Sequence, residues 1–186
     1  MEMTSHALLT AVHGMLFGAF FLLALFGVIV ELCRQLGETQ PAELTPRAHL
    51  LERLYLLLTV ALGWAAVLTG TYLVYPWYRA LPPAGVVNLA AYPQALLKSS
   101  PATIAWHSFG MEWKEHVAWL APIAMTMVAW VLLRYPRQSR QIRAAVLAFA
   151  LVAFTAAGVA GFFGAMLNKR APIDGGPTIR LMEGAR

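Results

Sequence analysis

Four long apolar stretches dominate this sequence and restrict it to a helical membrane fold. They cover residues 7–30, 54–74, 117–133 and 144–167. Three of them exceed the roughly 20 residues that a helix needs to cross a bilayer, and the third gains length from an amphipathic run that starts near Thr103. Because lipid offers no partner for backbone N–H and C=O groups, each stretch is predicted to be a helix.

The composition supports the same interpretation, since 59% of the residues are hydrophobic and 12% are charged, against roughly 25% charged in a soluble domain. We therefore expect an all-α integral membrane protein, a single domain built as an up-down bundle of four transmembrane helices. The helices are expected at about 7–31, 50–75, 103–133 and 143–168. We expect an ordered, proline-containing loop at 76–102 and a polar tail at 169–186 that stays mobile or docks on a partner.

An even number of spans places both termini on one side of the membrane, side A, and the two short loops on the other, side B. The segment before the first stretch has no Lys or Arg, and the stretch is too long for the apolar core of a cleavable signal. The short side B loops are rich in arginine, which favours the cytoplasm. We expect a bacterial inner-membrane protein with periplasmic termini. Its net charge of +5 is attributed to orientation and anionic lipid, with no nucleic-acid partner.

Two histidines share one predicted depth in the membrane. Counting 18 residues inward from the charged residue that borders each stretch (residues 31, 53, 134 and 143) reaches His13, Thr71 beside Gly70, His116 and Gly161. Histidine within a membrane is energetically costly and usually functional. In an up-down bundle the first and third helices are diagonal, at a separation that suits a haem between two histidines. His13 and His116 are therefore predicted to be the axial ligands of one haem b.

The residues around this depth fit a flat cofactor. Gly14, Gly70 and Gly161 allow a close approach of the backbone, and Phe17 shares the helix face of His13. The single cysteine, Cys33, excludes covalent haem attachment through a CxxCH motif and a four-cysteine iron–sulfur cluster, so the haem would be held non-covalently. Two other roles stay open for the histidines, namely a hydrogen-bonded or proton-relay role and ligation of another metal, such as copper.

The segment 106–122, WHSFGMEWKEHVAWLAP, concentrates the polar chemistry of the chain. Lys114, with Arg79 from the preceding loop, is a candidate to pair with haem propionates on side A. Pro122 is expected to kink the helix about one turn below His116. A possible quinone and proton site is formed by side chains that can take protons from a quinol and by two side A tryptophans: His107, Glu112, Glu115, Trp106 and Trp77.

With four helices and histidines on a diagonal pair at one depth, the chain resembles the small four-helix b-type cytochromes that serve as membrane subunits of respiratory complexes. The resemblance is one of architecture and covers about 110 helical residues. It implies electron transfer through haem b, exchange with quinone or a redox partner, and other subunits of a membrane redox complex as partners. The alternative is a non-catalytic anchoring subunit without its own cofactor. Whether the chain is part of a quinone-linked oxidoreductase stays open.

Overall fold

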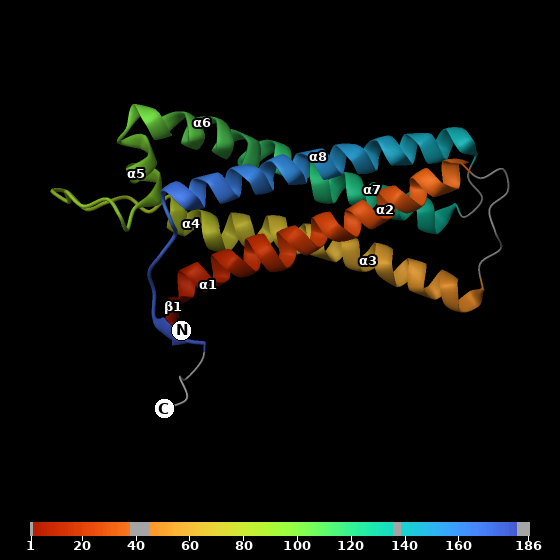
Figure 1. The fold of residues 1–186 in the computed structure, drawn as a ribbon, viewed down its shortest axis with the longest axis horizontal. Helices are drawn as coiled ribbons and strands as arrows, with labels where there is room; N and C mark the ends of the chain where they lie inside the picture. The colour runs from red at the N-terminus through yellow and green to blue at the C-terminus, as the bar shows by residue number, and fades with distance from the viewer. Residues whose placement is uncertain (1, 38–44, 136–138, 182–186) are drawn as a thin grey trace.

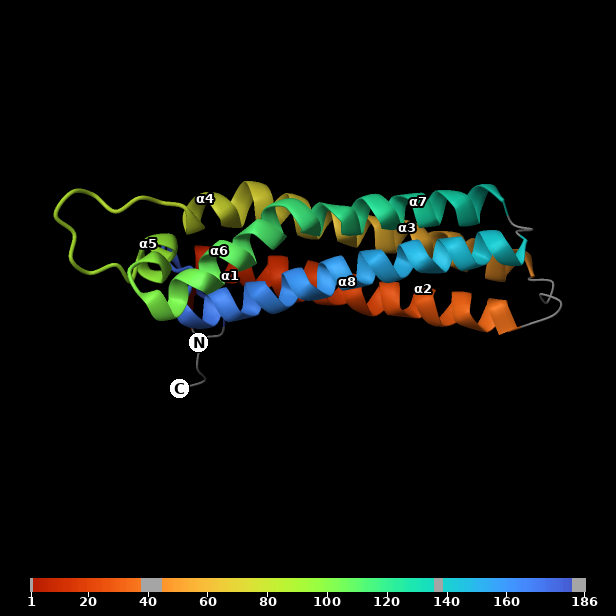
Figure 2. The same ribbon diagram turned by 90° about the horizontal axis from the view of Figure 1, so that it is seen from above.

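The structure, a computed structural model, describes residues 2–37, 45–135 and 139–181. Within these ranges, four long helices run alternately up and down (Figures 1 and 2). They span Ser5–Gly37, Pro46–Tyr78, Pro101–Arg134 and Arg140–Arg170, and each is long and apolar enough to cross a membrane. The expected all-α fold is confirmed, and the four spans indicate an integral membrane protein. Each helix extends beyond its expected ends, because polar residues continue it past the apolar stretch.

Three of the four long helices are interrupted by turns that are not α-helical. The first consists of α1 (Ser5–Ala11), the π-helical η1 (Val12–Ala19) and α2 (Phe20–Gly37). The second consists of α3 (Pro46–Thr69), the π-helical η2 (Gly70–Val74) and α4 (Tyr75–Tyr78). The third consists of α6 (Pro101–His116), the 3-10 turn η3 (Val117–Trp119) and α7 (Leu120–Arg134). The fourth is α8 (Arg140–Arg170), without interruption.

Each long helix begins at a Ser or Thr that caps it. The side chains of Thr4, Thr45, Ser100 and Ser139 accept hydrogen bonds from backbone N–H groups of the first turn, at 3.3 Å in each case. These N–H groups have no partner within the helix, so a side-chain oxygen there stabilises the start by about 1 kcal/mol. In α3 and α6 a proline follows the cap directly, where its missing N–H does no harm.

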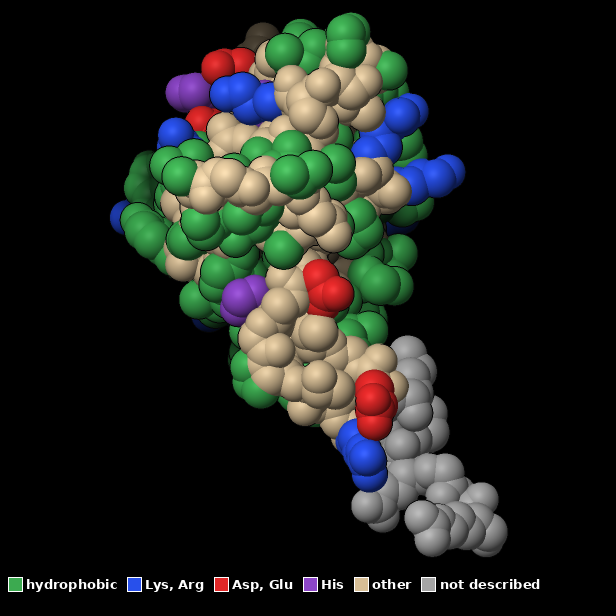
Figure 3. Space-filling view, turned by 90° about the vertical axis from the view of Figure 1, so that its left-hand side faces the viewer, with side chains coloured by type: hydrophobic (Ala, Val, Ile, Leu, Met, Phe, Trp, Pro, Cys, Tyr) green, Lys and Arg blue, Asp and Glu red, His purple; other side chains and the backbone are tan. Residues whose placement is uncertain are grey.

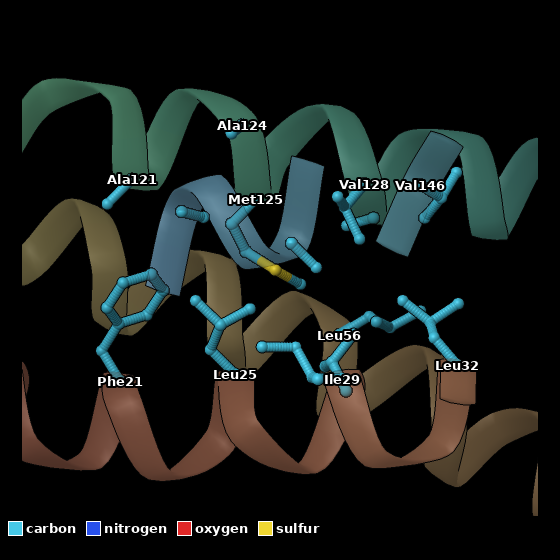
Figure 4. Packing of buried hydrophobic residues seen from close by; sticks show 14 of the residues in the cluster. Phe21, Leu25, Ile29, Leu32, Leu56, Ala121, Ala124, Met125, Val128 and Val146 are labelled. Atoms are coloured by element: carbon cyan, nitrogen blue, oxygen red, sulfur yellow. The ribbon is translucent and has the colours of Figure 1, made fainter. Parts of the chain in front are cut away.

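The main hydrophobic core fills the side B half of the bundle, between α2, α3, α7 and α8. Leu25, Met125, Val128 and Ala150 are fully buried in it. Figure 4 shows α2 side chains pointing toward those of α7, with Leu56 of α3 and Val146 of α8 beside them. Packing links α2 to α3 and α8, and α7 to α3 and α8. The first and third long helices are therefore diagonal in the bundle.

The side A end carries both termini and a second, smaller core (Figure 1). That core consists of Tyr78, Leu97, Met111, Leu167, Ala171 and Ile173. Leu97 belongs to the short helix α5 (Pro93–Lys98), which follows the loop after α4. The tail was expected to stay mobile or to dock on a partner. In the structure its strand β2 (Thr178–Arg180) pairs antiparallel with β1 (Glu2–Thr4), at the N-terminus of the same chain.

Candidate functional site

Two of the helix interruptions, η1 and η2, meet between the two cores. η1 packs on α3 and α8, η2 packs on α1, and His13 of η1 lies against Thr69 and Gly70. This is the depth of His13 and Gly70, and we call it the His13 layer. Short π-helical turns inside α-helices occur often at functional sites. The interruptions single out this layer as a candidate site.

His13, in η1, is half-buried and faces the second long helix. Its Nδ1 lies 3.2 Å from the hydroxyl oxygen of Thr69, and that hydroxyl donates its own hydrogen to the carbonyl of Ala65 at 2.6 Å. The Thr69 oxygen is therefore the acceptor, and Nδ1 of His13 carries the hydrogen. A neutral imidazole with its hydrogen on Nδ1 keeps a lone pair on Nε2, which is the form that binds a metal ion.

Gly70 makes room for the His13 ring. A Cβ at Gly70 would lie 2.6 Å from Cε1 of His13 and 3.2 Å from its Nε2, so any larger residue would displace the imidazole. The structure thus brings together two of the residues that the sequence placed at one depth. The space beside Gly70 is taken by the His13 ring, where the sequence suggested the edge of a porphyrin.

His116, the last residue of α6, lies on the outer face of the bundle. Its side chain is 68% exposed and its Nδ1 lies 3.3 Å from a carboxylate oxygen of Glu112. The same nitrogen lies 3.1 Å from the backbone carbonyl of Glu112. The helix is interrupted directly after His116, because Pro122 has no N–H to donate to the carbonyl of Ala118. The contacts of the described residues do not join His116 to His13.

Lys114 reaches into the bundle from α6. Its Nζ would lie 3.1 Å from a Cβ at Gly164, so the glycine of α8 leaves space for the ammonium group. Among the described residues, no carboxylate, carbonyl or hydroxyl forms a hydrogen bond or ion pair with Lys114. A positive charge within a membrane usually has a partner, so this ammonium can take an anionic group.

Two of the glycines predicted around the cofactor lie on the outer face of the bundle. Gly14 and Gly161 are exposed, and a Cβ at either would meet nothing within 4 Å. Phe17 is half-buried in η1. For a haem, the described side chains therefore offer His13 as an inward ligand and Lys114 as an inward cation. The imidazole of His116 does not face His13, so this arrangement does not form a pair of axial ligands.

A second polar site lies at the side A end, where α4, α5 and α6 enclose a pocket of about 220 Å³. Acidic, basic and histidine side chains lie close together at one edge of this end (Figure 3). The pocket brings together four of the predicted residues, Arg79, His107, Glu112 and Glu115. Its lining also includes five residues outside the predicted site, namely Tyr75, Tyr78, Gln94, Ser108 and Met111.

Tyr78 and His107 are the most closely coupled pair in this pocket. The Tyr78 hydroxyl lies 2.5 Å from Nδ1 of His107, and the two rings stack with their centroids 5.9 Å apart. The two predicted tryptophans lie outside the lining. Trp77 stacks on His6 at 3.8 Å, and Trp106 packs on two phenylalanines of α8 beneath the guanidinium of Arg170.

Thr69 and Tyr78 could have been found from the sequence. Thr69 precedes Gly70 at the predicted depth, and Tyr78 lies one turn after Tyr75 at the same helix end. In the described parts of the chain, no group of three or more His, Cys, Asp and Glu side chains is placed to hold a metal ion. No family model, curated protein or solved structure matches the chain.

Proposed function

We propose that this protein is a membrane electron-transfer subunit that binds one haem b at the His13 layer and exchanges electrons with quinone or a redox partner on side A. The observation that carries the proposal is the orientation of His13. Its Nδ1–H is held by Thr69, which leaves the Nε2 lone pair for iron. A hydrogen bond to the remote nitrogen is the usual companion of metal-binding histidine.

Two further features support a charged, flat ligand at this layer. The side chain of Lys114 is directed into the bundle, against Gly164 of α8, where its ammonium group can pair with a haem propionate. The first and second long helices lose α-helical geometry there, in η1 and η2. The haem would supply one-electron chemistry, while His13 would hold the iron and Lys114 would orient the carboxylate.

The absorption spectrum of the purified protein tests this function directly. Sharp, split bands of reduced low-spin haem b, with about one haem per chain by a pyridine assay, are expected. His13→Ala should abolish the bands, whereas His49→Ala, an exposed change near the start of α3, should leave them intact. A preparation from a haem-supplied host without a Soret band would reject the proposal and favour the anchoring subunit.

The second axial ligand is tested separately, because the His116 ring lies on the outer face. If His116 turns inward to become the second ligand, as the sequence predicts, His116→Ala should convert the low-spin spectrum to a high-spin one. An unchanged spectrum would assign the second position to another group. Titration of the apoprotein with haemin and with its dimethyl ester tests Lys114. Wild type should bind haemin about tenfold more tightly than the ester, and Lys114→Met should lose this preference. Lys98→Met, an exposed change in α5, is the control.

The placement in a bacterial inner membrane with periplasmic termini is part of the same proposal. Its support is the arginine in the side B loops and the absence of Lys and Arg before the first apolar stretch, a distribution that favours side B in the cytoplasm. Reporter fusions after residues 36 and 90 test it. The fusion after residue 36 should report the cytoplasm and the fusion after residue 90 the periplasm, and the reverse result would invert the orientation.

A further inference from the structure

The pocket between α4, α5 and α6 combines hydrogen-bond donors and acceptors in one small space. Arg79, Gln94 and Ser108 provide donors, and the carboxylates of Glu112 and Glu115 provide acceptors. Tyr75 and Met111 contribute apolar surface to the same lining. Most of the lining is polar, so the pocket suits a small ligand that both accepts and donates hydrogen bonds.

The Tyr78–His107 hydrogen bond fixes which nitrogen of His107 faces a ligand. The Tyr78 hydroxyl has no other acceptor among the described residues, so its hydrogen is donated to Nδ1 of His107. The neutral imidazole then carries its hydrogen on Nε2, and Nε2–H is a donor. Tyr78 is only 5% exposed and belongs to the smaller core, so the second long helix holds this pair rigidly.

We infer that this pocket binds the headgroup of a quinone, with Nε2–H of His107 donating to one ring oxygen and Glu115 accepting from the hydroxyl of the reduced form. A quinone oxygen accepts hydrogen bonds, whereas a quinol hydroxyl also donates, and the pocket offers both kinds of partner. Its volume of about 220 Å³ lies below the roughly 300–1,000 Å³ typical of sites for whole drug-sized ligands. The ring therefore fits, and an isoprenoid tail would remain in the lipid.

Oxidation of the bound quinol releases two electrons and two protons. One O–H bond breaks toward the carboxylate of Glu115 and the other toward that of Glu112, and both residues are exposed, so the protons can continue to water. The protons thus have acceptors in this chain, while the proposed haem b, if bound, would supply the one-electron acceptor that the oxidation requires. This electron step rests on the proposed function, whereas binding of the quinone does not.

Binding is measured with the full-length protein in detergent, titrated with a short-chain benzoquinone and followed by quenching of tryptophan fluorescence. Tyr78→Phe retains the ring and removes the hydroxyl, and His107→Ala removes the donor. Each should weaken binding about tenfold, the loss of one well-made hydrogen bond to a buried group. His49→Ala, at the opposite end of the bundle, should bind as wild type does.

Glu115→Gln separates binding from proton transfer. The oxidised quinone should bind this variant as it binds wild type, while quinol-driven reduction of the haem should slow about tenfold or more, because the amide does not accept the proton. Equal quinone affinity in wild type, Tyr78→Phe and His107→Ala would overturn the inference, as would no binding at all. Displacement of the quinone by glycerol phosphate would overturn it in favour of a lipid headgroup on Arg79. If the purified protein binds quinone but contains no haem, the haem proposal is rejected and the inference of a quinone site in this pocket stands.

Discussion

The side B half and the His13 layer are built from the same four helices, yet they pack differently. In the side B half, α2, α7 and α8 are regular, and Leu25, Met125 and Val128 interdigitate with no exposed surface. In the His13 layer, two helices leave α-helical geometry, in η1 at His13 and in η2 directly after Thr69. Apolar side chains pack without disturbing the backbone, whereas polar groups in a membrane need partners that an unbroken helix does not supply.

Small residues serve different purposes in the two regions. Ala150, Ala153 and Ala156 of α8 are buried in the main core and let α8 approach α2 and α7 closely, as small residues do in membrane bundles. Gly70 and Gly164 instead make room for the His13 ring and the Lys114 ammonium. The same residue class therefore supports dense packing in one half and accommodates polar side chains in the other.

Truncation in the main core should have the largest effect on stability. Leu25→Ala removes a side chain with no exposed surface and should lower the free energy of unfolding by about 2–4 kcal/mol, because the cavity is not refilled. Leu23→Ala on the same helix is the control, since Leu23 is 66% exposed. Unfolding in mixed detergent micelles measures both. Equal effects would show that the side B half is loosely packed and would remove the contrast between the two regions.

Gly70→Val tests whether the His13 layer is sterically tight. The new Cβ would lie 2.6 Å from His13 Cε1, so the ring must move away from Thr69, and we expect a loss of about 1–3 kcal/mol in unfolding free energy. Gly14→Val is the matched control, because a Cβ at Gly14 meets nothing within 4 Å. Similar losses for both variants would mean that His13 is not held against the second helix.

Thr69→Val tests the hydrogen bond that orients His13, with nearly the same side-chain shape. Loss of the acceptor should lower the unfolding free energy by about 0.5–1.5 kcal/mol and remove the preference for hydrogen on Nδ1. Nitrogen chemical shifts of the labelled imidazole report the tautomer. Thr155→Val, at an exposed position of α8, should change neither quantity. An unchanged tautomer in Thr69→Val would show that another group sets it.

The level of a residue along its transmembrane helix was predictable from the sequence, whereas the face of the helix on which its side chain lies was not. A helix rises by a fixed 1.5 Å per residue, so counting from the charged ends placed His13 and Gly70 at one level, and the structure brings them together. The same count placed His116 at that level without giving its face. Its position directly before η3 sets the helical phase, and the ring lies outside.

The lengths of the apolar stretches predicted the four spans well, because a helix must be apolar over roughly 20 residues to cross the hydrocarbon core of a bilayer. The pocket at side A was predicted only in part, since His107 and Glu115 share one helix face, whereas Tyr78 and Gln94 reach the pocket from other elements. The pairing of β1 with β2 joins residues about 175 positions apart through three residues each. Such a short pairing leaves no periodic pattern in the sequence.

The smallest expected effect is at this junction of the two termini, which is outside the four spans and exposed. Two hydrogen bonds to the Asp174 carboxyl lower its pKa. The larger effect comes from the Thr4 hydroxyl and the smaller from the backbone N–H of Gly175. A lowered pKa in the folded protein means that the carboxylate contributes stability above its unfolded pKa of about 3.9, and that this contribution is lost as the pH falls through the lowered value.

We therefore expect the pairing of β1 with β2 to hold at neutral pH and to loosen only below about pH 4. Hydrogen exchange of the backbone amides of residues 2–4 and 178–180, after correction for intrinsic rates, measures this opening. In Asp174→Asn the junction should be looser at neutral pH and should lose most of its dependence on pH, since the amide does not ionise. The ion pair of Glu2 with Arg180 at 2.9 Å also titrates with Glu2, so Glu2→Gln is the control that isolates Asp174. If Asp174→Asn keeps the acid-induced opening of wild type while Glu2→Gln loses it, the pH dependence belongs to the ion pair and not to the hydrogen bond from Thr4.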